Sequence, residues 1–484
     1  MKRLHNIVTN SVRYWCAGIL ILCLCSCAGK YEVNIDDAPE ITDVMCKATS
    51  SQILLNARFS GNADMVSECG FMFGLTGSDS ERFEVPKSEN SFSLMIDDFD
   101  FDSEYRVVAY ISNGRNVIYS PKYIVRTPKP GEKEPDEPEV PQIPQEDWSS
   151  SVDLSVSGTA NCYIVSQSGS YKFRPTQGCS ETSVGDVVAV EVLWETFGTA
   201  ETPDVGQLVK TVAYEDEYIY FKVPDPYLEG NAVIAAKDKS GTILWSWHVW
   251  LTDQPSEQIY YNDAGILMDR NLGATSAAVG EVGALGLLYQ WGRKDPFIGS
   301  SSISESINAC STIEWPSSLR ADKSIGTIEY SIKHPTTCIK SEYINKDWVW
   351  TGTEERDMTR WSTSDQPKTI YDPCPSGWRV PDGGNAGVWA KALGLSTNID
   401  MVSDPVFKGI DFSGIFGPDL SIWYPAAGSL SDGDLLSAGL TAYYWSATSG
   451  PTSAYRLLFS YKVSIKLDHT GGAALAASVR CVRD

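Results

Sequence analysis

The chain has 484 residues, roughly three times the length of a typical domain, so its length predicts two to four domains. Its 42% hydrophobic and 21% charged residues are typical of a folded globular chain and exclude wholesale disorder, a collagen and a protein with many membrane spans. With 39 basic and 62 acidic residues the net charge is -23, which disfavours nucleic acid as a partner because polyphosphate backbones are repelled at long range.

The first 26 residues have the pattern of a secretory signal. Basic residues precede an apolar run, Trp15–Leu24, which is too short to span a bilayer as a stable helix. The run ends in small residues before Cys27, and this arrangement resembles a bacterial lipobox whose cysteine becomes the lipidated first residue of the mature chain. The alternative is an uncleaved, cysteine-rich anchor. We therefore expect an outer-membrane lipoprotein, facing the cell surface or the periplasm, whose partner is the membrane through acyl chains on Cys27 and whose residues 27–37 form a tether.

Residues 38–127 predict a β-sandwich. Short stretches rich in β-branched and aromatic residues alternate with Gly, Asn, Asp and Ser, as in a domain of about seven strands. The segment from Tyr105 to Tyr119, with its turn at Asn113-Gly114, resembles the penultimate strand and hairpin of fibronectin type III modules. The strands are expected at residues 41–46, 52–59, 68–74, 92–96, 105–112 and 117–126.

Residues 128–147 predict a spacer. Prolines alternate there with acidic residues, so the stretch is stiffened by proline and extended by like charge. The alternative is a proline-rich ligand for a recognition domain.

Residues 148–255 predict a second β-sandwich-like domain. Its last expected strand, residues 243–251, carries apolar side chains on both faces, which indicates that both faces are covered. His248 lies in this strand, so we expect a buried, hydrogen-bonded histidine rather than a ligand. The other strands are expected at residues 162–166, 170–173, 187–194, 218–223 and 231–237.

Residues 256–484 carry five motifs in a fixed order, at 268–274, 286–296, 371–381, 443–448 and 479–482. Together they resemble the Fibrobacter succinogenes major paralogous domain, a module of bacterial surface lipoproteins that looks similar to C-type-lectin-like folds. The resemblance implies an α+β C-type-lectin-like module. Together with the two β-sandwich-like domains before it, the fold class expected is mostly β. A short helix is expected at residues 385–394, between an asparagine and a glycine.

Eight cysteines follow Cys27, an even number that permits four disulfides in an oxidising compartment. We expect Cys374 and Cys481 to be bridged, because both belong to motifs that flank one module. Pairing stays open for the others, with neighbours in sequence as the simplest partners and free buried thiols as the alternative for the first two pairs. These others are Cys46, Cys69, Cys162, Cys179, Cys310 and Cys338.

The sequence does not predict an enzyme. It has only four histidines, and no GxSxG, HExxH or phosphate-loop motif. The triplets with which C-type lectins hold calcium and sugar are missing too, so no cofactor is expected beyond a weak structural calcium at Asp432 and Asp434.

We expect a surface binding or adhesion protein whose ligand is a glycan or a surface protein. The candidate site is the set of loops around Trp348, Trp350 and Trp361, since tryptophan offers a flat apolar face and loops carry recognition. Polar neighbours of Trp348 suggest an exposed edge. Tyr443 and Trp445 are lesser candidates, and the alternative is that all five rings are core. The competing functions are a structural or assembly component of fimbria-like surface structures and, on fold analogy alone, an enzyme.

Overall fold

The computed structural model describes residues 39–49, 52–76, 78, 80–88, 90–112, 117–129, 147–315, 318–341, 346–353, 358–396, 398–399, 406–450, 453–461 and 463–484. The expected lipid site at Cys27, the tether, the Asn113-Gly114 turn and spacer residues 130–146 lie outside these ranges. The chain divides into two compact units, Met1–Glu146 and Asp147–Asp484. We call residues 39–129 the first unit and residues 147–484 the second unit.

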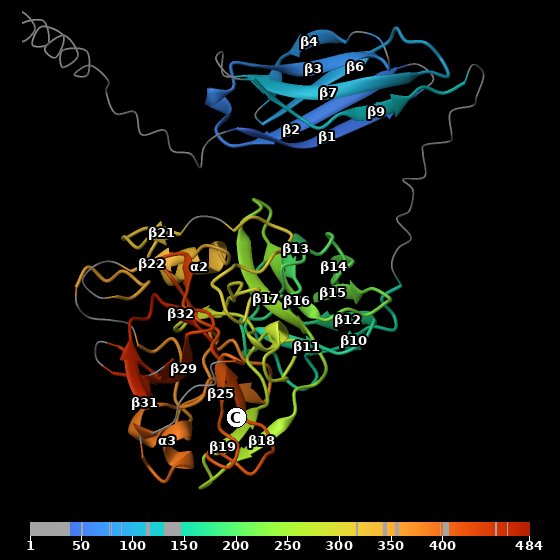
Figure 1. Ribbon diagram of the computed structural model, residues 1–484. Helices are drawn as coiled ribbons and strands as arrows, with labels where there is room; N and C mark the ends of the chain where they lie inside the picture. Colours follow the sequence, from blue (N-terminus) through green and yellow to red (C-terminus); the bar gives the residue numbers. More distant parts are fainter. Residues whose placement is uncertain are drawn as a thin grey trace, which may run out of the picture. The chain divides into compact units, whose positions relative to one another are not determined.

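The first unit is a β-sandwich whose two sheets share one buried cluster (Figure 1). One sheet has the order β1-β2-β6-β5, and in the other β4-β3-β7 is extended by β8 and β9, which both pair with β7. The expected strand at 117–126 is split because Pro121 interrupts it, and the Ser120 hydroxyl accepts a bond from the Ala109 N–H there. The strands are β1 Glu40–Ala48, β2 Ile53–Ser60, β3 Glu68–Leu75, β4 Glu81–Val85, β5 Lys87–Ser88, β6 Ser91–Ile96, β7 Glu104–Ser112, β8 Val117–Tyr119 and β9 Tyr123–Arg126.

The second unit begins with two four-stranded sheets, β10-β12-β15-β14 and β11-β17-β16-β13. The expected strand at 243–251 is β17, and both of its faces are covered: Trp247 packs in one buried cluster and Trp250 in another. His248 is buried as expected, with its Nε2 2.9 Å from Asn231 Oδ1. The strands are β10 Val152–Asp153, β11 Cys162–Val165, β12 Gly169–Phe173, β13 Ala189–Thr196, β14 Thr211–Glu215, β15 Tyr218–Val223, β16 Gly230–Lys237 and β17 Ile243–Leu251.

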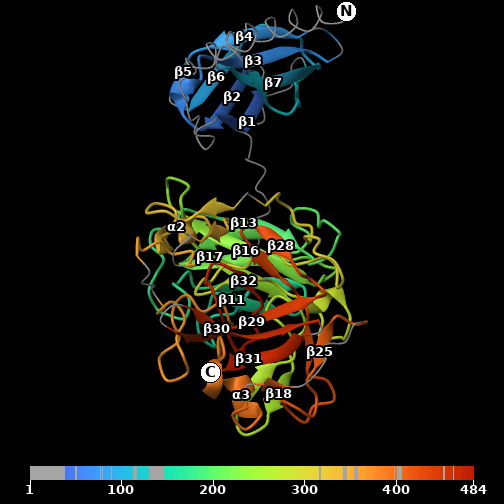
Figure 2. The same ribbon diagram turned by 60° about the vertical axis from the view of Figure 1, so that its left-hand side comes forward.

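Short strands and long loops make up the rest of the second unit. Its longest strands form the sheet β24-β31-β30-β29, where β29, β30 and β31 lie side by side (Figure 2). The strands are β18 Glu257–Tyr260, β19 Gly265–Met268, β20 Tyr289–Gln290, β21 Leu319–Arg320, β22 Ile339–Lys340, β23 Trp378–Arg379, β24 Asn398–Ile399, β25 Gly409–Asp411, β26 Trp423–Pro425, β27 Ser429–Ser431, β28 Asp434–Leu436, β29 Thr441–Ser449, β30 Ala454–Ser460, β31 Val463–Gly471, β32 Ala476–Ala477 and β33 Val482–Arg483.

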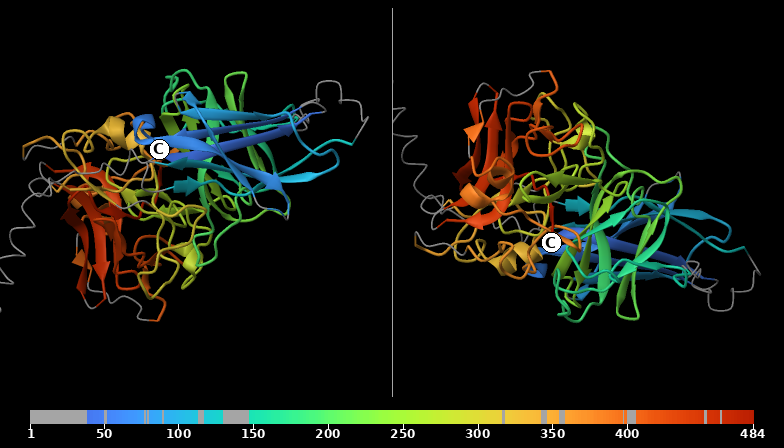
Figure 3. Two further views of the ribbon diagram at one scale, coloured as in Figure 1. Left: turned by 90° about the horizontal axis from the view of Figure 1, so that it is seen from above. Right: turned by 90° about the horizontal axis from the view of Figure 1, so that it is seen from below.

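The expected boundary at residue 255 does not separate two independent cores. One buried cluster joins Cys162 and Trp250 to Trp291, Trp445 and Cys481. Figure 3 shows the green strands before residue 255 and the red strands β29–β31 with yellow and orange loops of the same unit between them. These loops therefore pack as part of a shared core.

Helix is scarce, so the chain is mostly β and the expected α+β character of the last module is not seen. The described residues contain two α-helices, α2 Ile328–Lys333 and α3 Val388–Ala392. Three-residue 3₁₀ helices lie at Ala63–Met65, Val282–Ala284 and Gly384–Ala386. The helix expected from an asparagine start begins instead after Gly387, and the chain turns away at Gly394, whose φ is 65°. No helix in the described ranges has the length and apolarity needed to cross a bilayer.

The strand β33 lies between β19 and β23 in a sheet of the order β18-β19-β33-β23. Val482 lies opposite Leu267 on one side and Arg379 on the other. Beside it, Cys481 is bridged to Cys374, as expected. Residues from 479 onward thus link the start of the last region to its middle.

Candidate functional site

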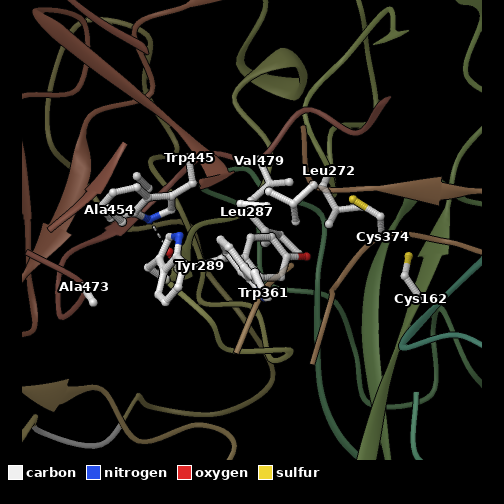
Figure 4. Packing of buried hydrophobic residues seen from close by; sticks show 14 of the residues in the cluster. Cys162, Leu272, Leu287, Tyr289, Trp361, Cys374, Trp445, Ala454, Ala473 and Val479 are labelled. Carbon is white, nitrogen blue, oxygen red and sulfur yellow. Dashed lines mark hydrogen bonds between the residues drawn. The ribbon is translucent and has the colours of Figure 1, made fainter. Parts of the chain in front are cut away.

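The expected exposed edge at Trp348 is wrong, and the candidate Trp361 is not exposed either, since each side chain is only 1% exposed. The Trp348 Nε1–H donates to the Trp291 carbonyl at 2.8 Å, and the Trp361 ring packs 5.7 Å from the Trp291 ring, centroid to centroid. Residues 346–350 form a loop, and the polar neighbours of Trp348 do not bring its ring to the surface. Figure 4 shows Trp361 among other buried side chains.

None of the other aromatic candidates is a fully exposed ring. Trp350 is half-buried and packs on Gly326 and Gly352. Trp445 is core, as its strand-like sequence suggested, and its Nε1–H donates to the Tyr289 carbonyl at 2.9 Å (Figure 4). Tyr443 is half-buried with a guanidinium above its ring. The five rings therefore do not form one binding platform.

A hollow of about 480 Å³ lies instead beside Trp361. We call it the Trp361 hollow. It lies in the part of the chain where the sequence places a binding surface, and its lining carries hydroxyl and amide side chains rather than exposed rings, although most of the surface that the lining exposes is apolar. The lining residues are Met358, Thr359, Trp361, Ser362, Thr363, Gln366, Pro367, Thr369, Ala447, Thr448 and Ser449.

Arg379 fixes the loop that forms one wall of the hollow. Its buried guanidinium donates to the carbonyls of Ser362 at 2.8 Å, Thr363 at 2.7 Å and Gln366 at 3.2 Å. It also pairs with the Asp484 carboxylate at 2.9 Å. One arginine thus holds three backbone carbonyls of a loop without regular structure. Sequence reasoning missed this role, although Arg379 stands inside the 371–381 motif.

The remainder of that motif forms the frame behind the loop. Lys368 Nζ donates to the carbonyls of Cys374 at 2.8 Å and Trp378 at 2.6 Å. Asp372 accepts from the N–H groups of Cys374 at 2.9 Å and Val380 at 3.0 Å, and burial raises the pKa of its carboxyl. These contacts keep the backbone of 372–380 in one conformation, so the motif is structural.

The hydroxyls of the hollow are oriented by the framework. Ser362 Oγ donates to the Pro367 carbonyl at 2.6 Å, while Thr448 Oγ1 accepts from the Gly383 N–H at 2.9 Å. A hydroxyl has one donor and two acceptor sites, so each keeps capacity for a ligand. None of the described residues that line the hollow is charged. The arrangement suits an uncharged ligand with many hydroxyl groups and some apolar surface.

The disulfide Cys374–Cys481 lies near the free Cys162 in the shared core (Figure 4). Burial raises the pKa of the Cys162 thiol far above its ordinary value, which makes it unreactive. The first two pairs of neighbouring cysteines, Cys46 with Cys69 and Cys162 with Cys179, are free thiols, which was the alternative to bridging. Cys310 and Cys338, which are also neighbours in sequence, are not bridged either. The free cysteines are Cys46, Cys69, Cys162, Cys179, Cys310 and Cys338.

The candidate calcium ligands lie at a hairpin. Asp432 has a φ of 53° in the turn between β27 and β28, and its carbonyl accepts from Ser318 Oγ at 2.7 Å. Asp434 begins β28. Nowhere in the described ranges do three or more His, Cys, Asp or Glu side chains gather as a metal site would require.

No protein-family model matches the chain, and neither does any curated protein. Solved structures give distant matches to β-sandwich proteins. A computationally redesigned β-sandwich protein is 15% identical, with 18% of this chain and 94% of that chain covered and a TM-score of 0.16. A two-domain fibronectin type III segment from chicken tenascin is 11% identical, with 40% and 90% covered and a TM-score of 0.15. A chimeric titin Z1Z2 functionalized with a peptide from decorin is 13% identical, with 45% and 96% covered and a TM-score of 0.15. Scores this low carry no argument about fold or function.

Proposed function

We propose that this chain is a lipid-anchored cell-envelope protein that displays its second unit on a spacer and binds a surface ligand through the Trp361 hollow. The lipobox-like sequence at Cys27 and the proline-rich, acidic stretch before residue 147 support the anchor and the spacer. The observation that carries the binding function is the hollow itself, a fixed concave surface on the unit that lies farthest from the proposed anchor along the chain.

We further propose that residues 256–484 form a module like the Fibrobacter succinogenes major paralogous domain. Two observations support this proposal. The five motifs occur in a fixed order, and residues in and next to the 371–381 motif hold the backbone around the hollow by hydrogen bonds. A motif that orients a loop, rather than one that supplies reacting groups, is what a binding module needs.

The ligand that fits the hollow best is a neutral glycan. Sugar rings combine hydroxyls with apolar C–H faces, and the hollow combines Thr363, Gln366 and Thr448 with the apolar Met358 and Pro367. A charged ligand would meet no opposite charge among the described lining residues. We propose binding without catalysis.

Binding is tested by displaying full-length protein to an array of neutral oligosaccharides and surface proteins. We expect capture by neutral oligosaccharides, and loss of capture in the double variant Thr363→Val/Gln366→Ala, which removes polar groups but leaves the core intact. Thr470→Val, an exposed threonine on β31, is the matched control. Capture that persists unchanged in the double variant, or that falls equally in the control, would reject the hollow as the site.

The anchor is tested separately. Labelling of cells with a palmitate analogue should give a lipidated product that vanishes in Cys27→Ala. Label retained in that variant would contradict the lipoprotein proposal while leaving the hollow unaffected.

A second candidate function is a component of fimbria-like assemblies. Strand β8 at the edge of the first unit pairs, within the described ranges, only with β7, and it exposes Val117, Ile118 and Tyr119 by 37%, 39% and 55%. An apolar edge strand is a template for pairing with another chain. If assembly is the function, the purified wild-type protein should form oligomers and Tyr119→Lys should be monomeric. A wild-type protein that is itself monomeric would contradict this second function.

A further inference from the structure

The strands β30 and β31 bring three basic side chains to one sheet face. Arg456 lies opposite His469, and Leu458 lies opposite Lys466, because the register shifts by one residue between these pairs. Residues three apart on a regular strand point to opposite faces, so the shift is what places Lys466 and His469 on the same face. On the other side β29 adds Tyr443 opposite Leu458. The three strands are the neighbouring ones in Figure 2.

Arg456 has no carboxylate partner in the described part of the chain, although it is only 7% exposed. Its Cζ lies 4.1 Å from the Tyr443 ring centroid, and its Nε donates to His469 Nδ1 at 3.1 Å. Its Nη1 is buried and has no hydrogen-bond partner. Among the described residues, Arg480 also lacks a carboxylate within 4 Å and leaves Nε and Nη1 without a partner, but its Nη2 donates to two oxygen acceptors. Four other buried arginines each meet a carboxylate within 4 Å, namely Arg270, Arg293, Arg360 and Arg379.

This arrangement is costly without an anion. A buried cation loses its hydration, and a nitrogen acceptor together with the faces of Tyr443 and Trp445, 4.1 and 5.2 Å from Arg456 Cζ, replaces only part of it. Burial lowers the pKa of Arg456 to about 10. Burial and the charges of Arg456 and Lys466 lower the pKa of His469 to about 4, with Asp468 acting in the opposite direction. At neutral pH the guanidinium of Arg456 is therefore charged and the imidazole of His469 is neutral.

We propose that Arg456, Lys466 and His469 form a binding site for a carboxylate. A carboxylate matches the planar fork of a guanidinium, and it would supply the counter-charge that Arg456 lacks. The exposed Lys466 would attract the anion, and the half-buried His469 lies opposite Arg456 on the neighbouring strand. The site is separate from the neutral Trp361 hollow, so it does not rest on the function proposed for that hollow. The carboxylate comes either from a short carboxylic acid or from an acidic sugar.

The test uses full-length protein with sodium acetate, sodium glucuronate and glucose as probes. Calorimetry should show saturable binding of at least one carboxylate and none of glucose. The imidazole signal of His469, followed by NMR and assigned with His469→Gln, should titrate at higher pH when the anion is bound, because a neighbouring negative charge stabilises the imidazolium. Arg456→Gln should weaken binding at least tenfold and Lys466→Gln severalfold. Lys239→Gln, at an exposed lysine in the β16–β17 turn, should not change it.

Binding of both carboxylates would assign a general carboxylate site, and binding of glucuronate alone would assign an acidic sugar. Lack of saturable binding, equal affinity in Arg456→Gln, or displacement by chloride at equal concentration would overturn the proposal. If Arg456→Gln does not fold, Arg456→Lys keeps the charge but removes the fork. Undiminished binding in that variant would then overturn the role of the guanidinium.

Discussion

Removal of the Cys374–Cys481 disulfide is expected to destabilise the second unit by about 4.8 kcal/mol in the chain-entropy account. The bridge joins residues 107 positions apart, and this separation sets the entropy that the unfolded chain regains when the bridge is absent. For a unit of this size the loss corresponds to a fall in melting temperature of roughly 7 °C.

The sequence offers a selective assay. The first unit contains no tryptophan between residues 39 and 129, whereas the second unit contains fourteen of the fifteen. Once the signal segment with Trp15 has been removed, tryptophan fluorescence during urea unfolding reports the second unit alone. The variant Cys374→Ala/Cys481→Ala avoids placing hydroxyls in the core, and Cys310→Ser at a half-buried free cysteine is the control.

The urea midpoint of the double variant should fall well below that of the wild type, and reduction of the wild type should reproduce the fall. The control should stay within about 1 kcal/mol of the wild type. A loss below about 1 kcal/mol in the double variant would refute the reasoning, because it would mean that residues 374 and 481 stay close in the unfolded chain without the bridge.

Three further predictions use the same assay. Burial lowers the pKa of His248 to about 3, below its unfolded value of about 6.5. Between pH 7 and pH 5 the unfolded chain therefore takes up a proton that the folded chain does not, and the free energy of unfolding of the wild type should fall by about 2 kcal/mol. His248→Gln should not show this fall, and equal pH dependence of the two proteins would contradict the prediction. The buried Glu195 accepts from three backbone N–H groups, so Glu195→Gln should destabilise the unit by about 2 kcal/mol, and a loss no larger than in the exposed Glu201→Gln would count against it. Trp348→Ala should lower the free energy of unfolding by about 3 to 5 kcal/mol because it leaves a cavity in the core. An unchanged urea midpoint would mean that the Trp348 ring is not part of the core.

Most strands of the first unit and of residues 148–255 were predictable because β-branched and aromatic residues are concentrated between turn residues. The strands β4, β5, β10 and β14 were not expected. Each of the strands expected there overlaps an observed one, and the apolar character of both faces of β17 correctly indicated two covering layers. The pair Cys374 and Cys481 was also predictable, because both cysteines lie in motifs of one module.

The shared core and the candidate site depend on contacts that leave no local pattern. Asn161 donates to the carbonyls of Ile370 and Asp372, more than 200 residues away, and nothing in its neighbourhood signals this. The polar Asp347 suggested an exposed loop at Trp348, but its side chain is fully buried in an ion pair with Arg360. A charged residue indicates solvent only when no partner is buried with it.

The placement of β33 has a consequence for biosynthesis. Leu267 and its partner Val482 are 215 residues apart, so at ordinary elongation rates they leave the ribosome roughly 10 to 40 s apart. Until Val482 has left the ribosome, β19 and β23 lack the strand β33 that lies between them, and Cys374 lacks its partner Cys481. The first unit has all of its strands long before that moment. The nascent chain thus carries a finished domain ahead of an incomplete one, and the incomplete one needs protection from premature strand pairing and from incorrect thiol oxidation.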